Sequence, residues 1–298
     1  IRLDADTKSG DFVGLLFDNR RVFYLTKIVD GYIAHFSLNW LFITGDNNPR
    51  HHAPNMSLLY LFELPFLLLG IYAFLFLKLD RKVKLLVFLW FLAAPVPASI
   101  TSGVPHAVRT INFLPLFQLF TAAGMLGVYQ FLQKYKGVSI KYKAIRLSLY
   151  TLFFILATFN FAYYSNQYFV QMNYVTAKDW QYGYAEAVPY INSISHNYQK
   201  IIVTNKEPLD QSYIFFLYYL KFPPREYHKL AGRNNSGGFA ESHAFGPYEF
   251  RTFDWNAEKK EQKTLYVGRP ADFPPGVKTL KTIYYPDGTP AMTIAGTN

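Results

Sequence analysis

Two short polar stretches hold the residues of this sequence that could do chemistry. Residues 102–115 (SGVPHAVRTINFLP) place His106 and Arg109 between two long apolar runs. Residues 44–55 (TGDNNPRHHAPN) form a second stretch, whose ionisable side chains are those of Asp46, Arg50, His51 and His52. A guanidinium held where an apolar helix meets water can bind an anion through charge-assisted hydrogen bonds. We therefore expect an anion site at the lipid surface around Arg109, with His106 beside it.

Each of these residues also has a purely structural interpretation. Arg109 could instead be an interfacial anchor whose guanidinium extends to the lipid headgroups. The adjacent His51 and His52 indicate a metal only weakly, because ligands on one helix or strand usually need other spacings to share a face. A hydrogen-bonded loop is the alternative, and the sequence by itself predicts no metal site.

Glu63 is an acidic residue inside an apolar run (FELPFLLLG). A carboxylate at membrane depth costs roughly 2.5–3.5 kcal/mol on insertion scales unless it is paired or wetted. We interpret Glu63 either as part of the site, orienting one of the cations, or as a hydrogen-bonding residue that holds helices together.

The elements that must position these residues are membrane helices. The bilayer core is about 30 Å thick and needs about 20 helical residues. The apolar runs of the sequence are 56–77, 85–100, 111–132 and 145–164. The second run is short, and Pro95 and Pro97 near its end would let it finish irregularly inside the protein. We predict a membrane α-helical bundle of about four transmembrane helices over residues 56–164.

The basic residues predict how this bundle is oriented. Lys and Arg gather in the connections 78–84 and 133–146, whereas the middle connection has only Arg109. Cytoplasmic loops collect Lys and Arg. Both polar stretches and the C-terminal part are therefore expected on the extracytoplasmic side of a multi-pass protein of the cell (inner or plasma) membrane.

Two flanking regions complete the predicted domain organisation. Residues 1–55 are extracytoplasmic, with an amphipathic helix that lies either in the bilayer interface or on the protein's own surface, followed by the polar loop. Residues 165–298 alternate helical and β-branched patterns and are expected to form an extracytoplasmic α/β domain. The predicted elements there are helices at 176–195 and 210–222, strands at 200–204, 248–255, 263–267, 280–285 and 291–295, and a loop at 234–243.

Composition excludes several classes of function. There is no Cys, so disulfides and Cys-ligated zinc are excluded. The net charge of +10 lies largely in the two basic loops, and no basic stripe with interleaved aromatics is present. We therefore expect no nucleic-acid partner. The Rossmann, Walker A, HExxH and GxSxG motifs are also absent.

Several segments together resemble the C-terminal half of a bacterial membrane glycosyltransferase of the GT-C fold. The resemblance is to the group of dolichyl-phosphate-mannose–protein mannosyltransferases and aminoarabinose transferases. The segments that carry it are FITGDNNPRHH, ELPFLLLG, PHAVRTINFLPLFQLFTAAG, DWQYGYAEAVPYI, KIIVTN and SYIFFLYYL. The resemblance extends over most of the chain, although no single motif is diagnostic.

The resemblance implies transfer of a sugar from a polyprenyl-phosphate donor to a protein, lipid or glycan acceptor on the extracytoplasmic face. It does not imply a particular cofactor, although a divalent cation would be compatible with it. In such families the catalytic carboxylate lies in the first extracytoplasmic loop, which nothing here matches, so we expect it upstream of Ile1. The residues expected to bind the lipid phosphate or the substrate are Arg109, His106, Arg50, His51, His52, Glu63 and Asp46.

A second function remains open at this point. The chain could be a non-catalytic, membrane-anchored protein that binds a sugar or a partner protein.

Overall fold

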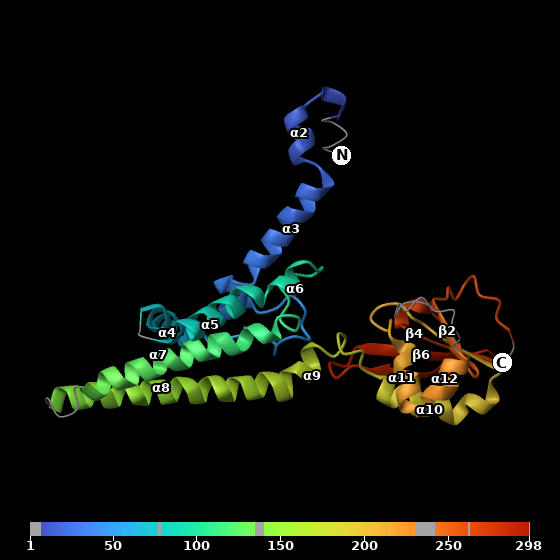
Figure 1. Cartoon of the computed structure of the whole chain (residues 1–298). Helices are drawn as coiled ribbons and strands as arrows, with labels where there is room; N and C mark the ends of the chain where they lie inside the picture. Colours follow the sequence, from blue (N-terminus) through green and yellow to red (C-terminus); the bar gives the residue numbers. More distant parts are fainter. Residues whose placement is uncertain (1–6, 77–78, 135–139, 231–241, 262, 298) are drawn as a thin grey trace. The chain divides into compact units, whose positions relative to one another are not determined.

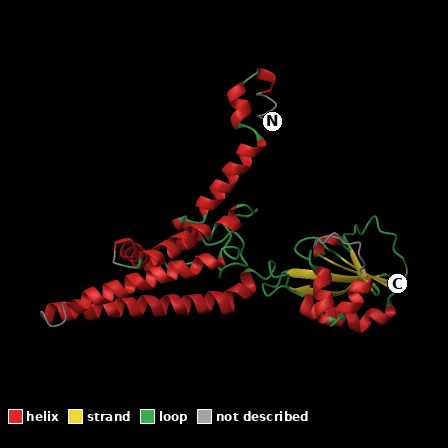
Figure 2. Cartoon of the chain, in the orientation of Figure 1, coloured by secondary structure: helices red, strands yellow, loops and turns green. Residues whose placement is uncertain are grey.

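A computed structural model describes residues 7–76, 79–134, 140–230, 242–261 and 263–297. The chain divides into two compact units, Ile1–Phe169 and Val170–Asn298. The first unit is helical and the second contains all of the described strands (Figures 1 and 2).

The first unit begins with two amphipathic helices. Asp11 caps the start of α2 (Phe12–Phe17) and Asn19 caps the start of α3 (Arg20–Ala34), each by accepting hydrogen bonds from backbone N–H groups. Apolar side chains of α3 such as Phe23 and Leu25 are exposed. The helix ends at Ala34 with His35 as its C-cap, and the short π-helix η1 (Trp40–Thr44), which follows a few residues later, leads into the first polar loop.

Apolar helices make up the rest of this unit. They are η2 (Leu61–Glu63), α4 (Leu64–Phe76), α5 (Arg81–Ala93), α6 (Val96–Ser99), η3 (Ile111–Phe113), α7 (Leu114–Lys134) and α8 (Ile140–Asn166). Helix α8 is followed by η4 (Gln167–Gln171) and α9 (Met172–Val175).

Three of these helical stretches are long and apolar enough to cross a membrane: Arg81–Ser99, Ile111–Lys134 and Ile140–Val175. The predicted first span, 56–77, is helical only over Leu61–Phe76, which falls in a shorter class of 10–17 residues. Its last residue lies outside the described part of the chain. A membrane α-helical bundle followed by an α/β part is therefore consistent with the structure, but the count of four spans is not confirmed.

The helices extend into the basic connections that the sequence analysis assigned to loops. Helix α5 begins at Arg81, where Asp80 Oδ1 accepts a hydrogen bond of 2.7 Å from the Lys82 N–H. Helix α8 begins at Ile140, so Lys141 is also helical. The helices therefore begin before the predicted spans 85–100 and 145–164, because Lys and Arg are good helix formers and a capping Asp can start the helix among them.

Two glycines let α4 and α7 approach closely. A Cβ on Gly70 would overlap the carbonyl oxygen of Phe120, and a Cβ on Gly124 would overlap that of Phe66. Small residues at a helix crossing permit backbone contact, which replaces the hydrophobic driving force that is missing between helices in lipid. Gly127, on the same helix as Gly124, faces open space.

Aromatic side chains join α5 and η3 to the end of α3. The rings of Phe36, Phe91 and Phe113 pack with centroids 5.1–5.3 Å apart. Trp40 and Phe42 of η1 are buried in the same core. This cluster fixes the places where the two polar loops leave the helices.

The second unit is built on a mixed sheet with strand order β2-β3-β1-β4-β6-β5. Strand β1 pairs in parallel with β3 and β4, and the other pairings are antiparallel. The strands are β1 (Lys200–Val203), β2 (His243–Phe245), β3 (Tyr248–Phe250), β4 (Thr264–Gly268), β5 (Thr279–Tyr284) and β6 (Pro290–Gly296). The helices are α10 (Tyr184–Ile194), η5 (Ser195–Asn197), α11 (Ser212–Tyr219), α12 (Pro224–Leu230) and η7 (Pro270–Asp272).

The two faces of this sheet are covered differently. On one face α10 and α11 contribute Val188, Ile191 and Phe216 to the main core. On the other face residues between β3 and β5, including Phe253 and Trp255, pack against Ile202 and Tyr266.

Several predicted elements of this unit are shorter in the structure. The predicted helix 176–195 starts only at Tyr184, after a left-handed Gly183. Asp210 does not cap α11, because its Oδ1 accepts a hydrogen bond from Gln181 Nε2 at 2.8 Å. The predicted loop 234–243 lies mostly outside the described residues.

The glycine crossing gives a testable difference between two positions on α7. Gly124→Val should weaken the packing of α4 on α7, because its side chain would overlap the backbone at Phe66. An over-packed core position costs about 1–3 kcal/mol. Gly127→Val, which meets open space, is the matched control. Unfolding midpoints of the two variants in the same detergent would test this, and equal midpoints would contradict a close crossing.

Candidate functional site

The first polar loop is folded around His52. Gly45 has a φ of +73°, and a Cβ there would lie 3.1 Å from Nδ1 of His52. Nε2 of His52 lies 2.8 Å from the Asp46 carbonyl oxygen, and Nδ1 lies 3.0 Å from that of Ala53. Both ring nitrogens are thus engaged with the backbone. His52, which we predict to bind substrate, holds the loop closed through these contacts.

The second polar loop makes a helical turn at His106. The hydroxyl of Thr110 donates to the His106 carbonyl oxygen at 2.8 Å, and the Thr110 N–H donates to the same oxygen at 3.2 Å. At the start of such a turn the backbone N–H groups lack partners within the turn. One of them, the N–H of Ala107, points at the first loop.

Asp46 joins the two loops. Its Oδ2 accepts a hydrogen bond of 2.6 Å from the Ala107 N–H, and its Oδ1 accepts one of 2.8 Å from the Asn48 N–H. Burial of Asp46 works against ionisation, but these two N–H donors and the nearby His51 outweigh it and hold the pKa of the carboxyl below its ordinary value. Asp46 is therefore a buried carboxylate at neutral pH.

His51 and His106 meet beside this carboxylate. Nδ1 of His51 lies 3.0 Å from Oδ2 of Asp46, and the two imidazole rings are 4.4 Å apart between centroids. One ligand atom from each of the three residues lies within 4.8 Å of the others. Nδ1 of His51 is buried, and among the described residues it has no partner with hydrogen-bond geometry. Such a nitrogen is suited to a metal ion.

The ligand set favours a divalent metal. Two imidazoles and one carboxylate are accepted by first-row divalent cations, and three protein ligands leave positions open for water or substrate. Imidazole binds metals when neutral. Burial, with smaller contributions from Arg109 and His51, lowers the pKa of His106, so this ring is neutral at pH 7.

His35 contacts the backbone of His106 and was not predicted as part of the site. It is fully buried, its Nε2 accepts the His106 N–H at 3.2 Å, and its Nδ1 lies 2.7 Å from the Gly31 carbonyl oxygen. Accepting at Nε2 requires the proton on Nδ1, which then donates to Gly31. Burial lowers the pKa of His35 and keeps this neutral form. The only sequence signal was a His at the end of an amphipathic helix.

Arg109 is held at one end and open at the other. Its Nη1 donates to the Thr101 hydroxyl and to the Ser102 carbonyl oxygen, both at 2.7 Å. Within the described part of the chain, no contact is recorded for its Nε and Nη2. These two groups form the fork that binds carboxylate or phosphate through two parallel hydrogen bonds. The exposed Arg109 can therefore bind an anion while its Nη1 keeps the hydrogen bonds to Thr101 and Ser102.

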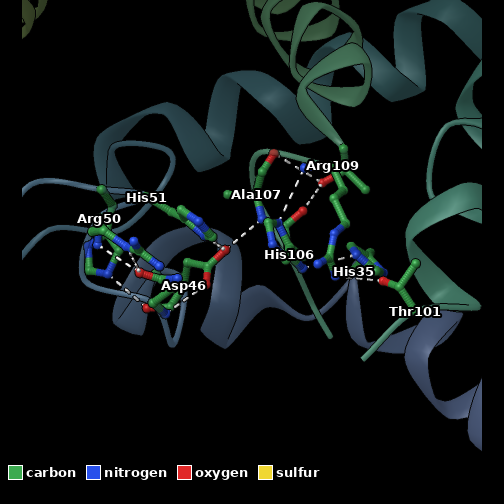
Figure 3. A network of polar contacts seen from close by, with 12 residues as sticks. His35, Asp46, Arg50, His51, Thr101, His106, Ala107 and Arg109 are labelled. Carbon is green, nitrogen blue, oxygen red and sulfur yellow. Dashed lines mark hydrogen bonds and ion pairs between the residues drawn. The ribbon is translucent and has the colours of Figure 1, made fainter. Parts of the chain in front are cut away.

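Two other predicted residues do not join this cluster. Arg50 Nε donates to Asn48 Oδ1 at 3.3 Å, and the close-up places Arg50 and Arg109 on opposite sides of His106 (Figure 3). Glu63 lies at the start of α4, and no described residue forms an ion pair with it. The prediction that Glu63 orients one of the site's cations is not supported by any contact.

Comparison with known proteins adds no relative. No family model, curated protein or solved structure matches the chain. The resemblance to GT-C glycosyltransferases therefore stays a prediction.

The site should make folding stability depend on pH through His35. Its pKa is lowered in the folded state, so the unfolded chain takes up the proton first. The contribution of His35 to the free energy of unfolding is therefore fully present above the pKa of about 6.5 in the unfolded chain. This contribution falls as the pH drops below that pKa. The loss for one group is at most about 1.4 kcal/mol per pH unit.

His35→Gln should reduce this dependence, because Gln keeps a donor and an acceptor but does not titrate. Unfolding midpoints of both proteins, measured in detergent between pH of about 7.5 and about 5.5, test the expectation. Parallel curves would show that His35 does not contribute.

A metal should bind at Asp46, His51 and His106. We expect Zn²⁺ or Mn²⁺ to bind the purified protein, and His51→Ala to weaken binding at least about tenfold, or about 1.4 kcal/mol. Binding should also weaken as the pH falls, because protons compete with the metal for the imidazole nitrogens. Calorimetric titration would measure both effects. His228→Ala, at an exposed position of the second unit, is the control, and equal affinity in all three proteins would rule out this site.

Proposed function

We propose that this chain is part of a membrane glycosyltransferase of the GT-C type. It would use a sugar donor carried on a polyprenyl phosphate and pass the sugar to a protein, lipid or glycan acceptor. The site and the second unit would face the extracytoplasmic side of the cell membrane.

The observation that carries this proposal is the meeting of the two polar loops. Asp46 of one loop bonds to Ala107 of the other, which brings a candidate cation site and the open edge of Arg109 onto the same short turn. This turn connects two helical stretches that are long and apolar enough to cross a membrane. A lipid-borne phosphate requires this combination of positive groups and adjacent apolar surface.

The residues would divide the work as follows. Arg109 binds the donor phosphate through its Nε and Nη2 groups, and Thr101 with Ser102 sets the plane of the guanidinium. Asp46, His51 and His106 would hold a divalent cation, which would supply further positive charge at the site. Both act as preorganised charges that stabilise the negative charge developing on the departing phosphate. We assign no catalytic base to the described residues.

Arg109→Ala should abolish sugar transfer by the full-length protein and leave folding and membrane insertion intact, because Arg109 is exposed and packs no core. Arg109→Lys separates the two interpretations of this residue. A headgroup anchor keeps its function as Lys, whereas a bidentate phosphate ligand loses most of it. The loss should be about 10²-fold or more, as for removal of other charge-stabilising donors.

The measurement is transfer from polyprenyl-phosphate sugars by full-length protein in lipid vesicles, with and without a chelator. Arg225→Lys, at an exposed position of the second unit, is the matched control and should transfer normally. Full activity of Arg109→Lys would remove Arg109 from the phosphate site. Failure of the wild-type protein with every such donor would sink the proposed function itself.

A further inference from the structure

The second unit contains a cavity of about 530 Å³ that is separate from the site described above. It lies over the face of the sheet that α10 and α11 do not cover. Its floor is formed by buried side chains, those of Ile202, Phe253, Thr264 and Tyr266. Its polar walls contain Lys200, Lys206, Arg251, Thr252, Asp254, Glu258, Lys259 and Glu261.

Arg251, Glu258 and Lys200, which line this cavity, are joined to one another by ion pairs that also include Glu249. Arg251 Nη1 and Nη2 bind the two carboxylate oxygens of Glu258 at 2.6 and 3.0 Å. Arg251 Nε lies 3.4 Å from Glu249, whose other oxygen lies 2.8 Å from Lys200 Nζ. The groups form a continuous chain from Lys200 to Glu258, so the cavity wall is polar and nearly neutral.

This pairing decides which ligand fits. At the centre of this chain an anion would have to displace Glu258 from its two-point contact with Arg251, and a cation bound to Glu258 would have to displace Arg251. Each paired carboxylate oxygen nevertheless keeps a lone pair that can accept a further hydrogen bond, and ammonium and hydroxyl groups remain as donors. A wall of alternating fixed donors and acceptors suits a ligand with many neutral hydroxyl groups.

We propose that this cavity binds a neutral carbohydrate. Its volume lies within the range of about 300–1,000 Å³ that is usual for small-molecule sites. The buried apolar floor would lie against the C–H face of a sugar ring, and the ion-pair chain would bind its hydroxyls. The proposal does not depend on the glycosyltransferase function, because it rests only on residues of the second unit.

Ala257 allows a test that spares the ion pairs. It is exposed and lines the cavity, so Ala257→Phe would fill the space without entering the core. Asn256→Phe places the same ring on the neighbouring exposed residue, which does not line the cavity. The whole chain in detergent would be titrated with neutral trisaccharides (mannotriose, chitotriose and laminaritriose), with inorganic phosphate and a sulfated disaccharide as anionic probes.

We expect at least one neutral trisaccharide to bind to the wild type and to Asn256→Phe, and to bind at least about tenfold more weakly to Ala257→Phe. Unfolding midpoints and metal affinity would show that both variants are folded. Three results would overturn the proposal: no neutral sugar binding at up to about 10 mM, binding of the anionic probes alone, or equal sugar binding by the two variants. None of them bears on transfer by the full-length protein.

Discussion

The carboxylate of Asp46 is the contact on which the candidate site depends. It is a buried charge that receives two backbone N–H groups and approaches an imidazole, and one of those N–H groups belongs to a loop 61 residues further along the chain. A buried carboxylate without such partners costs several kcal/mol. The two polar loops are therefore held together by complementary groups. The first loop supplies the Asp46 carboxylate, and the second supplies the Ala107 N–H, which has no partner within its own turn.

This arrangement explains what the sequence could and could not predict about the site. Polar residues between apolar runs stand out by composition, so Asp46, His51, His106 and Arg109 were all found. The roles within that set were not visible. Nothing in the sequence shows that His52 places both ring nitrogens against backbone carbonyl oxygens, whereas Nδ1 of its neighbour His51 lies beside the Asp46 carboxylate. His35 was missed because a backbone N–H is its main contact with the site, and a backbone donor leaves no mark on residue type.

The sequence also predicted the positions of the helices better than the details of how they begin and pack. Apolar runs predicted where helices occur, because a segment that crosses a bilayer has few alternatives for backbone hydrogen bonding. Their ends were predicted less well, since Lys and Arg are compatible with both a loop and the first turns of α5 and α8. The close crossing of α4 and α7 depends on Gly70 facing Gly124, whereas a Cβ on Gly127 would meet open space. A glycine in an apolar run indicates that another helix can pack closely there. Only the three-dimensional structure shows which glycine lies at a helix crossing.

Electrostatics connects the two halves of the proposed site. The Asp46 carboxylate is buried, the Arg109 guanidinium is exposed, and burial lowers the pKa of His106 and of His35. Asp46 and Arg109 together contribute no net charge, so without a metal ion the guanidinium alone would attract a phosphate. A divalent cation on Asp46, His51 and His106 would leave a local charge of about +2, and near a protein surface each pair of opposite unit charges at about 4 Å interacts by about 4 kcal/mol. Binding of a phosphate and binding of a metal should therefore strengthen each other, as linkage between neighbouring sites of opposite charge requires.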